Sequence, residues 1–593
     1  MTGATRREGR RAGRIRRFRG LLLLLLPLAL VGCVAVPTKG PVERVEGQQP
    51  ACQNCVNVDV APPAPGADPL EVVQGYLRAT SNYQPNFSVA KQFLTKAAAQ
   101  SWSPEDGASI YTGTPMASGD IVTLEGTLIG SLGADRTYTA RDQKIRIDFG
   151  MVQENGQWRI SKPPPGLMVE QYSFATFYQP YSLYFIGNQN VLVPDPIYVP
   201  SLSSQSSTTS VLMKGLLSGP STWLKPAVTS AIPTGTALSV DAVTVVDGVA
   251  DVALSDQVLA LNDAQRSLMA SQVLYTLKQV PGVQAVVFIV NQQPMRVPGA
   301  GADYSVSVST ISPDVDPIPF IAGDQLYAAR GDGIRVLDPS ATDLNGSRAV
   351  PGPLGDGRIP VSDLAVSGSN TDLAVITDGR RSLRRSGTAD GTVTTVLDRN
   401  ATDLLRPQFT RFGELWAVGR SRGQQRFWVF NGDEELPVQS PLLEGARTTA
   451  FQISPDGSRM AIVRQSGGRA ELGLARISRG DKIVVNGWRR IDTQQASLPE
   501  IARILDVAWI DDTDLLVLGA SSANAVPALF RVSQDASRIS PDTEPTTWDP
   551  IALTVLLSDQ STVVVGRRGQ TWKGSGGQWN PYIDGVRAAA YPG

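Results

Sequence analysis

The sequence predicts a multidomain, β-rich fold class: two α+β modules followed by an all-β propeller of six blades. Three observations predict it. The 593 residues are enough for roughly three to five domains of ordinary size. The 56 glycines and 42 prolines indicate many turns. A strand–turn–strand pattern also recurs five times in the carboxyl-terminal half, which is typical of a propeller.

Residues 1–32 have the layout of a secretory signal peptide. Eight arginines between Arg6 and Arg19 precede the apolar run Leu21–Val31. As a helix this run would be about 16 Å long, whereas a bilayer core is about 30 Å thick, so a transmembrane span is disfavoured. Removal of the peptide to leave a free Cys33 remains an alternative.

The segment Leu30-Val31-Gly32-Cys33 resembles the lipobox of bacterial lipoproteins. The resemblance implies that Cys33 receives an S-linked diacylglycerol, that cleavage follows before it, and that the new amino terminus is N-acylated. Two or more acyl chains give stable membrane anchoring. Val31 departs from the commoner Ser or Ala. We therefore expect a chain held by lipid on the extracytoplasmic face of the cell membrane.

Residues 33–67 predict an extended, proline-rich tether that contains Cys52-Gln-Asn-Cys55. A redox pair normally opens a helix after a strand, and no such pattern surrounds these cysteines. A zinc site needs two more Cys or His ligands, and the sequence holds three Cys and no His. We interpret Cys52 and Cys55 as a local disulfide in an exported segment, with redox chemistry as the alternative.

Residues 68–195 predict an α+β module in which helices precede a curved antiparallel sheet. Asp68-Pro69 is typical of a helix start, and Asn155-Gly156 predicts a tight hairpin turn. We expect a second helix that buries one face, formed by Val89, Phe93, Leu94 and Ala97. Strands are expected at Ile121–Leu128, Ile145–Gln153 and Trp158–Ile160. This order, ending in "NGQWRI", resembles the NTF2-like cone, here with a structural or partner-binding role.

Residues 196–300 predict a second α+β module. A hairpin over Val240–Leu254 turns at Asp247-Gly248, and a helix starts near Asn262 with Gln265 completing a capping box. The helix stops before Pro281-Gly282, and "VQAVVFIV" returns as a buried strand. Together with "GLLSGPSTW" and "VDGVADVAL", these segments resemble the GerMN domain, which implies a fold used for protein contacts.

Residues 315–593 predict the propeller. Five related segments begin at Asp363, Pro407, Phe451, Val507 and Leu553. Their spacings of 44, 44, 56 and 46 residues suit one four-stranded blade each. The chain ends in "VRAAAYPG", a first strand without a second, and the module begins with "DQLYAARGDGIRVLD", a second strand without a first. Joined, they would complete a sixth blade; a pair of β-sandwiches is the structural alternative.

The composition argues against catalysis. The sequence has no histidine, which removes Ser-His-Asp triads, Cys-His pairs and His-metal sites. Asp456 and Asp512 lie in blade turns, where turn chemistry explains them. Ser88-Val-Ala-Lys91 fits S-x-x-K, but S-D-N and K-T-G are missing. We predict no catalytic residue, no metal ligand and no cofactor, and a net charge of −1 favours no nucleic-acid partner.

Two local clusters of basic residues stand out in the propeller. They are Arg380-Arg381 with Arg384-Arg385, and Arg567-Arg568. They are interpreted as solvated loops, with contacts to an acidic partner or an anionic envelope polymer as the alternative.

The order of lipobox, tether, NTF2-like module, GerMN module and propeller resembles the actinobacterial LpqB lipoprotein family. The resemblance implies a non-enzymatic accessory protein of the MtrAB two-component system that contacts the extracellular domain of the sensor histidine kinase MtrB. It would modulate signalling in cell-wall homeostasis and cell division. The alternative is an envelope receptor that binds a cell-wall glycan or peptide fragment, so a small-molecule ligand stays open. A third alternative, an envelope hydrolase, is disfavoured because the sequence has no histidine.

Overall fold

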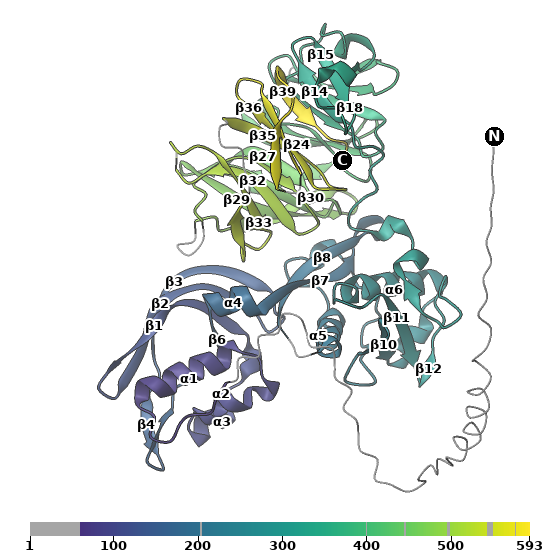
Figure 1. Ribbon diagram of the computed structural model, residues 1–593. Helices are drawn as coiled ribbons and strands as arrows, with labels where there is room; N and C mark the ends of the chain where they lie inside the picture. Colours follow the sequence, from purple (N-terminus) through teal and green to yellow (C-terminus); the bar gives the residue numbers. More distant parts are fainter. Residues whose placement is uncertain are drawn as a thin grey trace, which may run out of the picture. The chain divides into compact units, whose positions relative to one another are not determined.

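The computed structural model describes residues 60–593 except 202–203, 399, 444–445, 495–498, 523, 543–548 and 576. The described residues belong to one compact unit. The multidomain, β-rich class with two α+β modules and a propeller is confirmed (Figure 1).

The first module pairs a helix with a curved sheet. Helix α1 (Pro69–Ser81) begins at the predicted Asp68, whose Oδ1 accepts a hydrogen bond from Glu71 N at 2.8 Å. The sheet has the order β3-β2-β1-β6, with β6 parallel to β1 and the other pairs antiparallel. Its strands are β1 (Ala108–Ser118), β2 (Ile121–Leu132), β3 (Tyr138–Asp148) and β6 (Leu167–Glu170). Figure 1 shows α1 across the concave side of β1–β3.

The prediction of one second helix is wrong, because two short helices, α2 (Ser88–Gln92) and α3 (Lys96–Ser101), occupy that segment. Between them Leu94 forms a parallel bridge with Ile160. Thr95 then starts α3, since its Oγ1 accepts a hydrogen bond from Ala98 N at 3.2 Å. A bridge to a distant strand and a new cap therefore interrupt the helical periodicity.

The strand predicted over Ile145–Gln153 is also interrupted. β3 ends at Asp148, Gly150 has φ +58°, and β4 (Met151–Glu154) leads to β5 (Gln157–Ile160). The β4–β5 turn is confirmed, since Asn155 and Gly156 have φ values of 54° and 74°, as a type I′ turn requires.

Helix α4 (Gln171–Phe177) leads into a long hairpin of β7 (Tyr178–Ile186) and β8 (Leu192–Pro200). The hairpin crosses the boundary that the sequence placed between residues 195 and 196. Alternate side chains on one face pack into the core of the second module; they are Leu183, Phe185, Val193, Ile197 and Val199. The opposite face carries Tyr184 and Tyr198, which become important below.

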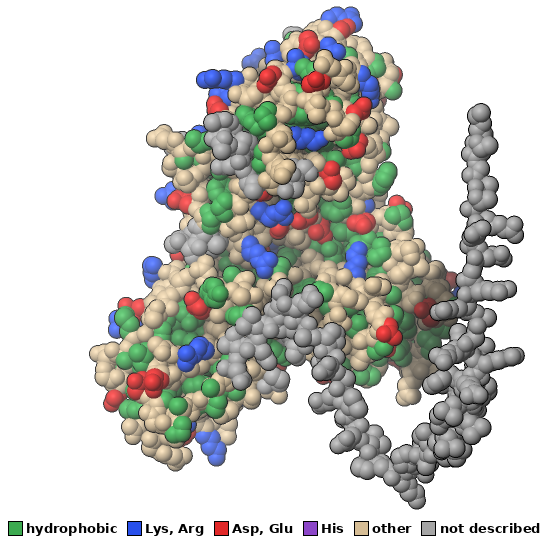
Figure 2. Space-filling model, viewed as in Figure 1, with side chains coloured by type: hydrophobic (Ala, Val, Ile, Leu, Met, Phe, Trp, Pro, Cys, Tyr) green, Lys and Arg blue, Asp and Glu red, His purple; other side chains and the backbone are tan. Residues whose placement is uncertain are grey.

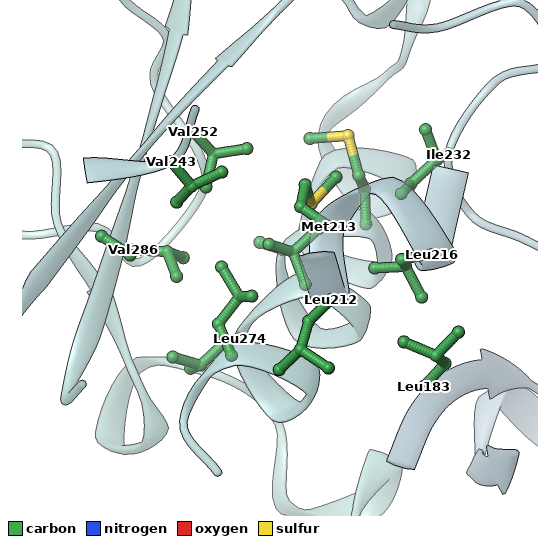
Figure 3. Close-up of a cluster of buried hydrophobic side chains, with 14 of the residues drawn as sticks. Leu183, Leu212, Met213, Leu216, Ile232, Val243, Val252, Leu274 and Val286 are labelled. Carbon is green, nitrogen blue, oxygen red and sulfur yellow. The ribbon is translucent and has the colours of Figure 1, made fainter. Parts of the chain in front are cut away.

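The second module packs two helices together with a small sheet. Helix α6 (Asp263–Leu277) has the predicted capping box of Asn262 and Gln265, and the β9–β10 turn is type I′ at Asp247 and Gly248. The remaining elements are α5 (Gln205–Ser218), β9 (Thr244–Val246), β10 (Val249–Leu254), β11 (Ala285–Val290), β12 (Gln293–Pro294) and β13 (Val306–Ser307). Leu212, Met213 and Leu274 meet Val252 and Val286 in its core (Figure 3).

Six sheets form the propeller. The first blade has the order β16-β15-β14-β39, in which the last strand of the chain pairs antiparallel with β14, so the predicted closure is confirmed. Its strands are β14 (Leu326–Arg330), β15 (Gly333–Leu337), β16 (Arg348–Ala349) and β39 (Val586–Ala590). Closure removes two strand edges that would otherwise remain exposed.

The other five blades follow along the chain, each starting from its innermost strand. Blade 2 contains β17 (Asp363–Val366), β18 (Asp372–Thr377), β19 (Ser382–Gly387) and β20 (Val393–Leu397). Blade 3 contains β21 (Ala401–Thr402), β22 (Gln408–Phe409), β23 (Glu414–Ser421), β24 (Gln424–Asn431) and β25 (Glu434–Leu436). Blade 4 contains β27 (Arg447–Ile453), β28 (Arg459–Ser466), β29 (Arg469–Arg479), β30 (Ile483–Ile491) and the added strand β26 (Val438–Gln439). Blade 5 contains β31 (Arg503–Trp509), β32 (Asp514–Ala520), β33 (Ala528–Ser533) and β34 (Ile539–Pro541). Blade 6 contains β35 (Pro550–Leu556), β36 (Ser561–Gly566), β37 (Thr571–Ser575) and β38 (Gln578–Pro581).

Candidate functional site

The predicted lipidation site Cys33 and the predicted disulfide partners Cys52 and Cys55 lie outside the described residues, so these assignments stay predictions. Within the described part of the chain, no helix is long and apolar enough to cross a bilayer. The same part contains no group of three or more acidic or cysteine side chains arranged to hold a metal ion.

The turns of blade 5 contact the β7–β8 hairpin through hydrogen bonds. Tyr184 Oη donates to Asp512 Oδ2 at 2.8 Å, and Tyr198 Oη donates to Asp535 Oδ1 at 3.3 Å. Arg538 Nη2 donates to the carbonyl oxygen of Tyr178 at 3.2 Å. The interpretation of Asp512 as a simple turn residue is therefore incomplete, because its carboxylate also joins the propeller to the hairpin.

Burial dominates the electrostatics of this junction. It raises the pKa of Tyr184 and of Tyr198, and the charges of Asp512 and Asp535 add to this. Burial also raises the pKa of Asp512. It raises the pKa of Asp514 to about 6, with the neighbouring charge of Asp511 as the second cause. A tyrosine with a raised pKa stays protonated at neutral pH. Tyr184 and Tyr198 therefore remain hydrogen-bond donors in this junction.

A fully buried ion pair lies under the junction. Arg459 donates to Asp456 Oδ2, and neither side chain has any exposed surface. Arg459 also donates to Gln534 Oε1 at 2.7 Å and to the carbonyl oxygen of Asp512 at 2.8 Å. Asp456, predicted as a turn residue, does accept a turn hydrogen bond from Ser458 N at 2.9 Å. This pair therefore connects the turns of blades 4 and 5.

A second contact joins the second module to blade 4 through Trp223. Its indole Nε1 donates to the carbonyl oxygen of Gly487 at 2.6 Å. The guanidinium of Arg489 lies 4.4 Å from the centre of the indole ring, and that of Arg476 lies 5.9 Å away. Such cation–π contacts are strongest where the cation is desolvated. Burial lowers the pKa of Arg489, which is in keeping with that environment.

A cavity of about 190 Å³ lies beside these contacts, between the hairpin and blade 5. Its walls include Tyr181, Pro196 and Gln279. Two buried polar atoms that line it, Gln534 Nε2 and Asp535 Oδ2, have no hydrogen-bond partner among the described residues. One is a donor and the other an acceptor, so the cavity suits a small polar molecule that offers both kinds of group.

An ion pair crosses the central axis of the propeller. Arg406, just before β22, donates to Asp506 Oδ1 at 3.2 Å and to the carbonyl oxygen of Leu553 at 2.6 Å. Asp506 and Leu553 lie on the innermost strands of blades 5 and 6, so the contact joins three blades. Asp363, the first residue of the neighbouring β17, pairs with Arg380, and burial raises the pKa of Asp363. These contacts place paired charges on the innermost strands of blades 2, 5 and 6.

Most arginines of the predicted basic clusters have acidic partners within the propeller. Arg384 pairs with Asp378 at 2.9 Å, Arg385 with Asp372 at 2.6 Å, and Arg567 with Asp549 at 3.1 Å. Acidic and basic side chains are interspersed on the face drawn in Figure 2. The arrangement favours solvated loops over a contact surface for an acidic partner.

Sequence reasoning missed Tyr184, Tyr198 and Trp223. The continuous apolar character of the hairpin strands was available as a signal, because a strand that is apolar on both faces indicates burial on both. It did not reveal which element would cover the tyrosine face. Fold and site together define a class: a multidomain propeller protein with buried ion pairs within and between its blades.

Comparison with known proteins places the chain within this class. The model described as "Lipoprotein LpqB, N-terminal domain" matches residues 62–175, and the "Lipoprotein LpqB beta-propeller domain" matches residues 340–592. Between them, the model "Sporulation and spore germination" (Germane) matches residues 182–296. The two LpqB models together cover more than half of the chain. The chain belongs to the LpqB lipoprotein family.

Relatives of similar length support that assignment. "Lipoprotein LpqB" of Cutibacterium acnes is 28% identical over 97% of this chain and 99% of its own length. "Lipoprotein LpqB" of Thermobifida fusca is 25% identical over 96% of this chain and 97% of its own. Among solved structures, putative TolB from Agrobacterium tumefaciens aligns with a TM-score of 0.31 and 13% identity, over 44% of this chain and 92% of that one.

Proposed function

We propose that this protein is a membrane-anchored, extracytoplasmic lipoprotein that binds the sensor histidine kinase MtrB of the MtrAB two-component system and modulates its signalling in cell-wall homeostasis and cell division. The observation that carries the proposal is the junction. The turn carboxylates Asp512 and Asp535 of the propeller accept hydrogen bonds from tyrosines of the hairpin, which supports a structural role for them.

The same contacts support a non-enzymatic role. Without histidine, an enzyme of this chain would depend on carboxylates, lysines or tyrosines as acids and bases. At the junction and on the propeller axis, these groups are held in hydrogen bonds or ion pairs with one another. Modules fixed in this way lose little freedom on association, which favours binding to a partner.

The anchor completes the proposal. Cys33 carries the S-diacylglycerol and N-acyl groups, residues 33–67 form the tether, and Cys52 and Cys55 form a disulfide within it. The test is Cys33→Ala, with Cys52→Ala as the matched control because it also removes one cysteine. The Cys33 variant should move to the aqueous phase on detergent partitioning, whereas the control stays in the detergent phase. A Cys33 variant that partitions like the wild type contradicts the anchor.

The kinase proposal is tested by binding. The mature protein without its lipid should bind the purified extracellular domain of MtrB saturably in an interferometry assay. The extracellular domain of an unrelated sensor kinase should not bind. Removing the propeller or the first module then locates the contact. Absence of saturable binding to MtrB contradicts the proposal.

A second candidate function, a receptor for a cell-wall glycan or peptide fragment, is favoured by the 190 Å³ cavity with its unpartnered Gln534 and Asp535 atoms. Calorimetric titration with a muropeptide mixture distinguishes the two. Saturable binding that is lost in Asp535→Asn, together with no binding to MtrB, would reverse our preference.

A further inference from the structure

The outer strand of blade 3 is incomplete. β25 pairs with only the last three residues of β24, where Val429, Phe430 and Asn431 lie opposite Leu436, Glu435 and Glu434. The chain then leaves blade 3 at Pro437, and β26 pairs in parallel with β30 of blade 4. No described strand pairs with residues 424–428 on this side. In blade 4, by contrast, β30 covers β29 from Leu472 to Arg479.

The hydrogen-bond pattern defines which backbone groups face this open edge. Arg422 and Gly423 form a two-residue hairpin turn, so Ser421 and Gln424 are its closing pair. In an antiparallel ladder the direction of the backbone groups alternates along the strand. Gln424, Arg426 and Trp428 therefore bond to β23, whereas the N–H and C=O groups of Gln425 and Phe427 face outward. Asn431 closes the β24–β25 hairpin, so its backbone groups point toward β25. This is the direction that the alternation gives for Gln425 and Phe427.

A cleft of about 760 Å³ lies along this same stretch. Every residue from Gln424 to Trp428 lines it, and Val438 and Ser440 line it after the chain has left blade 3. The Oγ of Ser440 is buried and has no hydrogen-bond partner among the described residues. The volume lies within the range of about 300–1,000 Å³ that is usual for ligand sites.

The charges of the cleft are unequal along its length. Arg426 donates to Glu435 Oε1 at 2.5 Å and lies 5.5 Å from the ring centre of Trp428, so its charge is neutralised where β25 ends. Arg422, at the opposite end, is exposed and has no ion pair within the described part of the chain. An added strand antiparallel to β24 would start beside Leu436 and finish beside Arg422.

We propose that blade 3 binds an extended acidic segment of a partner protein by strand addition, as its missing outer strand. The segment pairs antiparallel with Gln425 and Phe427 through their four outward backbone groups, and an acidic side chain near its carboxyl end pairs with Arg422. Main-chain pairing supplies affinity in this mode of recognition, and the side chains supply specificity. The site is independent of the kinase assignment, because it defines the partner only by conformation and charge.

The test uses a fluorescein-labelled peptide, Thr-Val-Thr-Val-Thr-Glu, in an anisotropy titration of the delipidated full-length protein. The key variant is Gln425→Pro, which removes one outward N–H and leaves the ladder to β23 intact. Its matched control is Gln425→Ala, because both variants lose the side-chain bonds of Gln425 to the backbone of Thr448. We expect saturable binding that weakens by about tenfold in the Pro variant relative to the Ala variant.

A charge reversal provides a second readout that does not depend on proline. Arg422→Glu should weaken binding of the Glu-ended peptide and strengthen binding of the same peptide ending in Lys. The proposal is overturned if the Glu-ended peptide shows no saturable binding, or if Arg422→Glu leaves the preference between the peptides unchanged. A concentration-dependent dimer that Gln425→Pro abolishes would also overturn it, since the occupant would then be a second copy of this chain.

Discussion

Arg459 and Asp456 show how single residues determine the arrangement of two blades. A buried charge is costly unless it is paired and its remaining polar atoms are bonded. Arg459 pairs with Asp456 and donates to Gln534 and to the carbonyl oxygen of Asp512, and its guanidinium lies 5.0 Å from the ring centre of Trp509. Its Nε has no hydrogen-bond partner among the described residues, so the requirement is met in all but this one atom. Each partner comes from a turn, so the pair fixes turns that the strands alone would leave independent.

The first prediction concerns this pair. Arg459→Met leaves Asp456 buried without its partner, and we expect a loss of about 3–5 kcal/mol in the free energy of unfolding of the propeller. Urea unfolding followed by tryptophan fluorescence measures it. The control is Arg146→Met, which breaks the exposed pair of Arg146 with Glu125 and should cost less than about 1 kcal/mol. Equal losses in the two variants would contradict the prediction.

The second prediction concerns Asp514, whose pKa is raised from 3.8 to about 6 by burial and the charge of Asp511. Between about pH 4 and pH 6 the folded protein keeps this proton and the unfolded chain releases it. The contribution of Asp514 to stability is therefore complete below about pH 4 and is lost as the pH rises through about 6.

Asp514→Asn removes that dependence. We expect the variant to gain about 2 kcal/mol relative to the wild type as the pH rises from about 4 to 7. Urea unfolding at a series of pH values measures the difference. Asp142→Asn, an exposed aspartate on β3, is the control and should follow the wild type at every pH. A wild type and Asp514 variant with parallel pH profiles would show that the proton is not retained.

At the scale of elements, local sequence signals predicted where helices start and where hairpins turn better than they predicted how long the helices and strands are. The helix start at Asp68, the capping box at Asn262 and the turns at Asn155-Gly156 and Asp247-Gly248 are all present, since each depends on contacts within a few residues. The predicted helix around Phe93 failed, because Leu94 pairs with a strand more than sixty residues away.

The strand repeats predicted the six blades for a similar reason. Each blade is mostly built from neighbouring segments joined by short turns, so its pairing is visible in the sequence. Blade 3 departs from this regularity, because Pro437 directs the chain to β30 before the outer strand is complete. The repeat pattern did not reveal this departure, because the pairing of β26 with β30 depends on a strand more than forty residues further along the chain.

The third prediction tests closure at this scale. A chain that ends at Gly585 lacks β39, so the inner edge of β14 loses its partner. We expect this protein to aggregate, because an open strand edge pairs with other chains. Size-exclusion chromatography measures the monomer fraction. A chain that ends at Pro592 loses only the exposed Gly593 and should stay monomeric. A stable monomer ending at Gly585 would show that closure is dispensable.

At the scale of the molecule, the two faces of the hairpin β7–β8 make different kinds of contact. Leu183 and Phe185 belong to the core of the second module, whereas Tyr184 and Tyr198 bond to blade 5. Trp223 adds a separate contact with blade 4. The hairpin thus links the modules by burial on one face and by directional hydrogen bonds on the other.

The fourth prediction concerns that coupling. Trp223→Ala removes the indole hydrogen bond to Gly487 and the contacts with Arg489 and Arg476. We expect thermal unfolding of the wild type to overlap in one main transition and that of the variant to separate into two, measured by scanning calorimetry. Tyr172→Ala, which truncates an aromatic side chain 69% exposed, is the control and should leave the profile unchanged. Identical profiles for the wild type and the Trp223 variant would contradict a coupling through Trp223.

The sequence by itself determined the class, the order of modules, the blade repeats and the helix caps, and it gives the prediction of Cys33 as the lipid anchor. These features depend on short-range patterns of polarity and on turn chemistry. Only the tertiary structure decided how the charges are used. Tyr184 and Asp512 are 328 residues apart, and Arg406 meets Asp506 across the propeller axis. No local pattern encodes such pairs, because the closure of the propeller and the packing of the hairpin bring them together.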